Sequence, residues 1–491
     1  MTVAWEGAAA ALVLVPLAAA ALAFVLPRCG AALGLASSAV GVAAALVVAG
    51  AVRDAGPLRH RVGGWGAPLG IDLRADGTSA LLLLVVAGIG AVVAVYARTY
   101  LRGDGHGHGG ARGADDPFWP LWLLLSAALS ALLLGADVFN LYVTLELVGL
   151  SAVALVALAG GRDATVAAMR YLLVGLTGSL LYLMGVAVLY GAYATVDLEL
   201  LARRARPDAA TWVALSLMTG GLLLKSALFP LHFWLPPAHA NAPAPVSALL
   251  SALVVKGSFY ILLRLWLEAF APLVATFALT LLGLLGAGAI LWGSMQALLQ
   301  TRLKLLVAYS TVAQLGYLLL VFPLAHHAGA AARDGVLLFV LAHACAKTAM
   351  FLAAGNLVRA AGHDRIADLA GVTHVLPLSV FAFALAGTSL VGLPPSGGFA
   401  AKWLLLDAGI GAGAWGWVAL ILLGSLLAAA YVMRFVGQAF VRADVLPAAR
   451  PVPATMEWTA LGLALASALL GLVAGWPLGL LQAAGPAGVA S

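Results

Sequence analysis

Long apolar runs, separated by short polar segments, occupy almost the whole chain. A helix of about 20 apolar residues crosses the roughly 30 Å hydrocarbon core of a bilayer, so each run is long enough to span a membrane. We predict fourteen spans, near residues 7–27, 30–52, 77–97, 117–136, 138–161, 171–196, 209–235, 242–263, 269–301, 305–325, 335–358, 375–406, 408–433 and 458–480. The pattern therefore predicts an all-α polytopic membrane protein with a single transmembrane domain over residues 1–491.

Composition agrees with this fold class and excludes others. Hydrophobic residues make up 63% of the 491 residues and charged residues only 9%, whereas a soluble domain carries about 25% charged residues. An ordinary soluble enzyme is excluded, and the net charge of +6, spread over scattered Arg residues, gives no reason to expect nucleic acid. Cys29 and Cys345 lie in apolar surroundings, so we expect buried thiols, no metal site and no bound cofactor.

Two of the spans are interrupted by proline and glycine. Residues 229–239 read Phe-Pro-Leu-His-Phe-Trp-Leu-Pro-Pro-Ala-His, and residues 392–398 read Gly-Leu-Pro-Pro-Ser-Gly-Gly. Irregular backbone at membrane depth survives only where protein or a water-filled cavity covers it, and paired broken helices are typical of transporters built from inverted repeats. The spacing predicts two inverted five-helix repeats, spans 4–8 over residues 117–263 and spans 9–13 over residues 269–433. Two kinked packing helices are the alternative.

Glu146 lies in the middle of the fifth span, inside a long apolar run. A charged carboxylate at that depth is costly unless a cation on another helix pairs with it. Lys225, five residues before Pro230 of the first interruption, is the candidate partner.

Lysine is rare in this chain, and its positions are informative. There are 21 Arg and 5 Lys, and four lysines lie inside spans: Lys225, Lys256, Lys347 and Lys402. Arg keeps its proton in any protein environment, whereas a desolvated Lys can both accept and release one, as a proton path requires. His343 stands four residues before Lys347 and projects from the same helix face. The alternative is that each Lys reaches an interface or forms a static pair.

Other polar residues are weaker candidates. His232 and His239 flank the first interruption, where they can relay protons or equally cap exposed carbonyls. Asp137, at the start of the fifth span, suits a helix cap better than a proton carrier, although we keep it as a supporting relay residue. Ser310 and Gln314 can hold water or form hydrogen bonds between helices, but packing is the favoured role. Residues 103–110, which contain two His among Gly and Asp, predict a polar loop.

Four stretches together resemble a known family, the antiporter-like subunits of respiratory complex I, membrane-bound hydrogenases and Mrp-type cation/proton antiporters. They are residues 137–146, residues 225–236 with His239 and 242–248, residues 308–317, and residues 392–402. Residues 63–71 resemble the D-type member of the Mrp antiporters more than the complex I members. The resemblance implies that Glu146 and Lys225 are the paired acid and base, Lys256 the central relay and Lys402 the terminal lysine of the second half-channel.

Three positions depart from the pattern of the family. Pro237 and Asn241 stand where the family often has an acid, and Leu305 stands where a second cation usually follows Lys304. These departures concern loop salt bridges rather than the central path.

The sequence thus favours a proton-translocating subunit of a multi-subunit Na⁺/H⁺ or other monovalent cation antiporter in the cell membrane. It would work with other membrane subunits, and a slight excess of loop cations places both termini on the outer side. One alternative is a proton-pumping subunit of a redox-driven complex I-like or hydrogenase assembly, in which case it would be part of an NADH-quinone oxidoreductase. Another, of a different class, is a non-conducting structural subunit.

Overall fold

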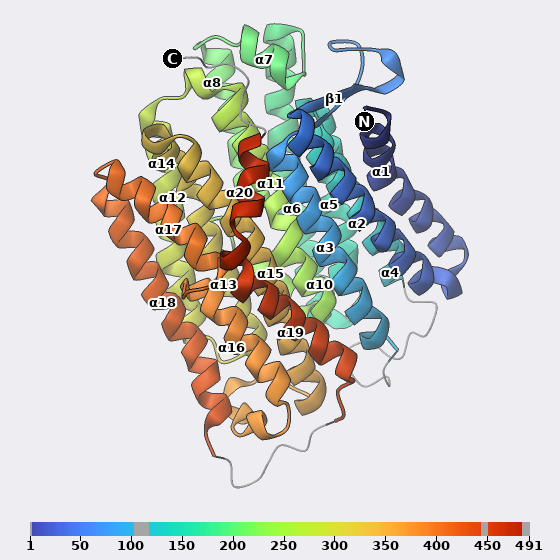
Figure 1. Ribbon diagram of the computed structural model, residues 1–491, viewed down its shortest axis with the longest axis vertical. Helices are drawn as coiled ribbons and strands as arrows, with labels where there is room; N and C mark the ends of the chain where they lie inside the picture. The colour runs from blue at the N-terminus through green and yellow to red at the C-terminus, as the bar shows by residue number, and fades with distance from the viewer. Residues whose placement is uncertain (1, 103–116, 443–449, 484–491) are drawn as a thin grey trace.

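The computed structural model describes residues 2–102, 117–442 and 450–483, and it is a bundle of helices that run along one common direction (Figure 1). The predicted loop at residues 103–110 lies outside the described residues.

The N-terminal part of the bundle contains four long helices and one hairpin. The hairpin pairs its two strands antiparallel, with Leu58 opposite Ala75. The elements are α1 (Thr2–Val25), α2 (Gly30–Ala55), β1 (Leu58–Arg61), β2 (Asp72–Ala75), α3 (Gly77–Tyr100) and α4 (Phe118–Leu134). The sequence pattern did not predict the hairpin, because its strands are only four residues long.

The next two groups of helices contain the interruptions that the sequence predicted. The first group comprises α5 (Val138–Ala157), α6 (Gly161–Tyr193), α7 (Leu198–Arg204), α8 (Ala209–Lys225), α9 (Leu235–Asn241), α10 (Ala244–Leu249) and α11 (Val255–Arg264). The second comprises α12 (Thr276–Leu299), α13 (Leu303–Leu319), α14 (Val321–Ala328), α15 (Ala330–Ala361), α16 (Pro377–Val391), α17 (Gly397–Gly411) and α18 (Trp415–Phe440). The described chain ends with α19 (Ala454–Leu469) and α20 (Gly475–Ala483).

Length and hydropathy make the chain a multi-pass membrane protein. In the described residues, 11 helices are long and apolar enough to cross a membrane. Three shorter apolar helices, Phe118–Leu134, Ala209–Lys225 and Pro377–Val391, coincide with predicted spans. The last two are short because each ends at an interruption. The exact number of fourteen spans stays a prediction.

The first interruption begins earlier than the proline pattern predicts. Helix α8 ends at Lys225, and the backbone then turns through Ala227, which has a positive φ of 52°. Pro236 and Pro237 do not break a helix. They occupy the first turn of α9, where the backbone N–H that proline lacks would have no partner within the helix. The irregular segment is therefore 226–234, and Lys225 stands at its edge.

The second interruption separates α16 from α17 at residues 392–396, as predicted. Gly392 ends α16 in the left-handed region, with φ of 90°, and the Ser396 side chain caps α17 by accepting from the Phe399 amide. A Cβ at Gly398 would lie 1.8 Å from the carbonyl oxygen of Ser389, so only glycine permits this approach. Lys402 follows one turn later.

The centre of the bundle is formed by three segments that are buried almost along their whole length. In Ala244–Ala269, Leu303–His326 and Ala330–Ala361, 100%, 89% and 89% of the most apolar stretch is buried. Residues Leu250–Val254, between α10 and α11, form a π-helical turn. A wider turn of this kind leaves a carbonyl outside the regular hydrogen-bond ladder. Polar side chains on these three segments are therefore shielded from lipid.

Both ends of the described chain lie at the same end of the bundle (Figure 1). Trp5, near the start of α1, contacts His60 of β1, and a Cβ at Gly56 would lie 3.8 Å from the Ala483 carbonyl. One expectation about the cysteines is wrong: Cys29 is exposed, because it lies in the short turn between α1 and α2. Cys345 is partly buried on α15.

Candidate functional site

Glu146 on α5 and Lys225 at the end of α8 form an ion pair inside the bundle. The Lys225 Nζ lies 3.0 Å from a carboxylate oxygen of Glu146, and the two side chains are 7% and 20% exposed. Lys225 also lies 3.5 Å from the Leu145 carbonyl, and the Ser179 hydroxyl of α6 hydrogen-bonds the same Glu146 oxygen. The partner expected from the sequence is thus in place, and α6 adds a neutral hydroxyl.

A cavity of about 380 Å³ adjoins this pair. Its lining includes Glu146, Lys225 and Tyr171, together with Gly149 and Gly175 of α5 and α6. Gly149 lies against the lysine: a Cβ at this position would be 3.4 Å from the Lys225 Nζ, an ordinary contact distance. The pair therefore borders open space in which water can lie beside both charges.

Lys256, on α11, is 5% exposed and lies at the centre of the bundle. Its Nζ hydrogen-bonds the Ser251 carbonyl of the preceding π-helical turn and lies 2.9 Å from Nδ1 of His343 on α15. The Nε2 of His343 has no partner among the described residues. Lys256 therefore joins a helix of the first predicted repeat to a helix of the second.

Lys347 lies one turn beyond His343 on α15 and is fully buried. Its Nζ hydrogen-bonds the Ser310 hydroxyl and lies 3.2 Å from the Val307 carbonyl, both on α13. Packing was the favoured role for Ser310, but the hydroxyl contacts the ammonium. Gln314, one turn further along α13, donates to the Tyr431 hydroxyl at 2.8 Å.

Lys402, on α17, is held without a carboxylate. Its Nζ donates to the Leu390 carbonyl at 2.8 Å and to the Ser425 hydroxyl at 3.0 Å. It also lies 4.4 Å from the ring centroid of Tyr317, which provides a cation–π contact. Because α16 ends at the interruption, no further helical turn follows whose amides could donate to the Leu390 carbonyl. The second interruption thus frees a backbone acceptor for Lys402, and Ser425 of α18 supplies another.

The supporting candidates have different surroundings. His239 is 0% exposed, stacks on Phe351 at 4.8 Å, and neither ring nitrogen has a partner in the described part of the chain. His232 lies in the first interruption, 8% exposed and stacked on Phe229 at 5.9 Å. Asp137 caps α5 by accepting from the amides of Phe139 and Asn140 at 3.0 and 2.7 Å, which fits the cap rather than a carrier. Burial raises the pKa of the Asp137 carboxyl.

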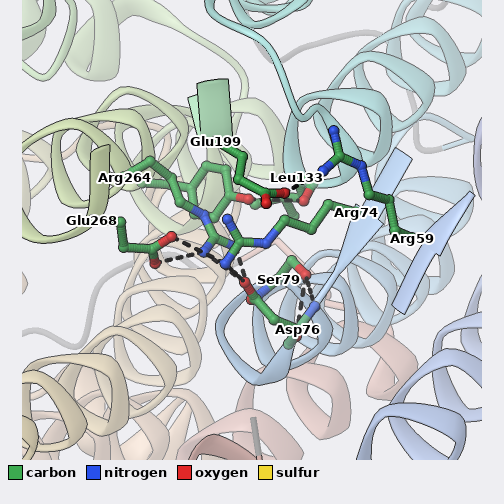
Figure 2. A network of polar contacts seen from close by, with 9 residues as sticks. Arg59, Arg74, Asp76, Ser79, Leu133, Glu199, Arg264 and Glu268 are labelled. Atoms are coloured by element: carbon green, nitrogen blue, oxygen red, sulfur yellow. Dashed lines mark hydrogen bonds and ion pairs between the residues drawn. The ribbon is translucent and has the colours of Figure 1, made fainter. Parts of the chain in front are cut away.

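The most buried arginine of the described residues was not apparent from the sequence. Arg264, 3% exposed at the end of α11, binds Asp76 through two hydrogen bonds of 2.6 and 2.7 Å and binds Glu268 at 2.6 Å. Arg74 of β2 contacts the same two acids at 2.9 and 3.2 Å. Figure 2 shows the two guanidinium groups between the carboxylates of Glu268 and Asp76. Two cations and two anions make this cluster neutral.

Arg59 of β1 holds the hairpin to the rest of this end of the bundle. It binds Asp72 at 2.6 Å, Asp197 at 2.8 Å and also Glu199 of α7. These contacts bring together segments nearly 140 residues apart in the sequence. Because none of these acids stands in an apolar run, the sequence pattern could not single them out.

Comparison with known proteins places the chain in a family. Residues 135–428 match the family described as "NADH:quinone oxidoreductase/Mrp antiporter, TM", and residues 65–108 match the "NADH-Ubiquinone oxidoreductase (complex I), chain 5 N-terminus". The chain belongs to the NADH:quinone oxidoreductase/Mrp antiporter transmembrane family. This confirms the resemblance drawn from the four sequence stretches.

Members of both branches of the family are similar to this chain. The N-type NADH-quinone oxidoreductase subunit of Desulforudis audaxviator is 39% identical over 85% of this chain and 82% of its own length. The D-type Na⁺/H⁺ antiporter subunit of Bacillus subtilis is 29% identical over 82% of this chain and 80% of its own. A solved chain of the Mrp complex from Dietzia sp. DQ12-45-1b has a TM-score of 0.88 at 26% identity and covers 99% of this chain and 97% of its own.

Proposed function

We propose that this chain translocates protons as one membrane subunit of a multi-subunit assembly of the Mrp or complex I type. The observation that carries the proposal is the Glu146–Lys225 ion pair at the edge of the first interruption. A buried pair is weak evidence for stability, because desolvating two charges costs about as much as their attraction returns. A pair that borders open space and consists of two groups able to exchange protons suits a switch.

The pair sets the charge state of Lys225. Two unit charges about 4 Å apart attract by about 4 kcal/mol at an effective dielectric constant near 20. If Glu146 moves away or takes up a proton, the Lys225 ammonium loses that stabilisation and its proton is driven onward. Lys256 and His343 form the next pair of groups that can take it, and Lys402 ends the series at the second interruption.

We further propose that the two interruptions belong to two inverted repeats, residues 117–263 and 269–433. Each half contributes one interruption with a lysine at its edge or one turn beyond it, Lys225 in the first and Lys402 in the second. The Lys256–His343 contact joins the halves, as a path through both requires.

We favour exchange of H⁺ for Na⁺ or another monovalent cation as the coupled reaction. The fit to the Mrp complex chain over 99% of the residues supports this choice, as does the similarity to a D-type subunit of a Na⁺/H⁺ antiporter. In such an assembly the partners are other membrane subunits of the antiporter, in a cell membrane.

The competing candidate is a proton-pumping subunit of a redox-driven assembly. The 39% identity to an N-type subunit named for NADH-quinone oxidoreductase favours it. The two candidates use the same buried residues and differ in what drives them. Proteoliposomes that hold the whole assembly distinguish them, because a Na⁺ gradient moves protons in the first case, and electron transfer to a quinone does so in the second.

The switch itself is tested with three variants in the assembled complex. We expect Lys225→Ala and Glu146→Ala to abolish proton movement, measured with a pH-sensitive dye in proteoliposomes, while the complex still assembles. Lys225→Arg keeps the charge and the pairing but cannot release a proton, so it should be as inactive as Lys225→Ala. Arg203→Ala, which removes an exposed surface pair, is the control. Full activity in Lys225→Arg would show that the lysine is only a structural partner of Glu146.

A further inference from the structure

A cavity of about 310 Å³ lies among α1, α2, α3 and α4, outside the helices that carry the candidate site. Helix α4 lines it with Trp122, Ser126 and Ser130, which are four residues apart and share one face. Helix α2 adds Ser37 and Ser38. Four hydroxyl groups therefore meet in a region where both the helices and the surrounding lipid are apolar.

Two further groups at this cavity need a hydrogen-bond partner. The Trp122 side chain is 1% exposed, and its Nε1–H, a donor only, has no partner among the described residues. On α1, Pro16 lies inside the helix and has no N–H, so the Leu12 carbonyl one turn earlier loses its usual donor. Both Leu12 and Pro16 line the cavity. It thus offers an unpaired donor and a carbonyl without its usual helical donor, as well as hydroxyls.

These groups define the ligand by its chemistry. None of the described residues that line the cavity is ionisable, so it provides no counter-charge for an ion, and the Trp122 N–H would repel a cation. A neutral molecule that both donates and accepts hydrogen bonds fits. Water meets this requirement, and the cavity has room for at least one molecule.

A second cavity, of about 280 Å³, separates this one from Lys256. Its lining includes Lys256, Leu129 and Leu133, and it is mostly apolar. Val86 of α3 lines both cavities, so its side chain is part of the wall that they share. Apart from Lys256 its lining is apolar, so it offers water few hydrogen-bond partners.

We propose that the cavity bounded by Trp122 and the four serines is a water-binding site, and that it forms a lateral branch to Lys256 closed by Val86. When Val86 turns aside, water enters the apolar cavity and a proton passes between the Lys256 amine and a water oxygen. The serine hydroxyls hydrogen-bond to the water and pass the proton on, because a neutral hydroxyl does not keep an added proton. The role given to Lys256 rests on the proposed function; the water site and its wall do not.

The water site is tested in the assembled complex with cysteine variants in a Cys29→Ala, Cys345→Ala background. Only a thiolate reacts with methanethiosulfonates, and a thiol in a dry or lipid environment does not ionise. We expect the small neutral reagent methyl methanethiosulfonate to label Ser126→Cys at least about tenfold faster than Val40→Cys, which lies on the outer face of α2 and is 42% exposed. Equal rates would show that the cavity is dry and overturn the proposal.

The branch is tested by the same labelling of Lys256→Cys. Removing the wall with Val86→Ala should raise its rate about tenfold, and filling the serine cavity with Ser126→Phe should reverse the gain. Val93→Ala, which shortens another buried valine of α3 that lines neither cavity, is the matched control and should have no effect. If Val86→Ala does not assemble, Val86→Thr keeps the shape of valine and adds a hydroxyl to the wall.

No change with either Val86 variant, or an equal gain with Val93→Ala, would rule out the branch. Because labelling needs no transport, these results stand apart from the Lys225→Ala experiment. If the Lys225 variants are inactive and the Val86 variants leave the labelling of Lys256→Cys unchanged, the proposed function stands and only the branch is removed. If the Lys225 variants are active and the Val86 variants raise the labelling of Lys256→Cys, the branch stands and the proposed function is removed.

Discussion

Lys256 and His343 lie 2.9 Å apart, Nζ to Nδ1, although 87 residues separate them in the sequence. A hydrogen bond between two bases requires that one of them offer a lone pair, so the pair cannot be fully protonated while the bond exists. The contact is thus a place where a single proton is shared between the first and second halves of the chain.

We expect the two residues to act as one unit in proton movement. Lys256→Met and His343→Ala should each lower the rate at least about tenfold, and the double variant should be little worse than either single one, because residues of one unit are not additive. Rates measured in proteoliposomes provide the double-mutant cycle. Independent losses that add in free energy would indicate that the contact is only a packing feature.

Ser179→Ala tests how the Glu146 charge is held. The hydroxyl of Ser179 donates to the same carboxylate oxygen that Lys225 contacts, and hydrogen bonds to charged groups are worth about 1.5–3 kcal/mol. Without the Ser179 hydroxyl, the Glu146 carboxylate is stabilised only by Lys225, so the ion pair should separate less readily. The rate of proton movement should then fall about tenfold. Thr177→Ala, an exposed residue on the same helix that bonds only its own backbone, is the control and should keep the wild-type rate.

Gly398→Ala should prevent formation of the second interruption. Its Cβ would lie 1.8 Å from the Ser389 carbonyl oxygen, which is backbone and cannot move away cheaply. The expected result is loss of the assembled complex, measured by purification of the intact assembly. At Gly437 a Cβ would meet nothing within 4 Å, so Gly437→Ala should assemble normally. A stable, active Gly398→Ala variant would show that the close approach is not required.

The Asp76 cluster predicts a dependence of stability on pH. Burial opposes the charged form of Asp76, but the guanidinium groups of Arg264 and Arg74 hold the pKa of its carboxyl well below the usual range. A depressed pKa stabilises the folded protein at pH values above the unfolded pKa of about 3.9, and this stabilisation is lost as the pH falls toward the folded pKa.

Asp76→Asn should therefore lower the melting temperature most at neutral pH. The difference from wild type should begin to shrink below about pH 5 and continue to shrink at lower pH. Thermal unfolding of the detergent-solubilised complex between neutral and acidic pH measures this. A difference that stays constant over the whole range would show that Asp76 does not act through its charge.

Some of the site was visible in the sequence because membrane burial leaves few places for charge. Glu146 and Lys225 could be singled out, since an ionisable residue within a long apolar run needs a partner on another helix. The second interruption could be placed because glycine and proline act locally on the backbone. The family resemblance followed from the same stretches.

Contacts between distant helices were decided only in three dimensions. The sequence did not show that His343 faces Lys256, that Ser310 bonds Lys347 or that Ser425 bonds Lys402, because these depend on how each helix is rotated within the bundle. The start of the first interruption at Ser226 was missed for a related reason: Pro236 and Pro237 fit the first turn of α9, so the break lies before them.

The sequence by itself determined the fold class, the family and the residues able to carry protons, because hydropathy and backbone-breaking residues act at short range. The tertiary structure alone decided which of those residues meet, since side-chain pairing depends on packing between helices. It also decided that Arg264 is buried against Asp76, and that four serines line one cavity beside Trp122.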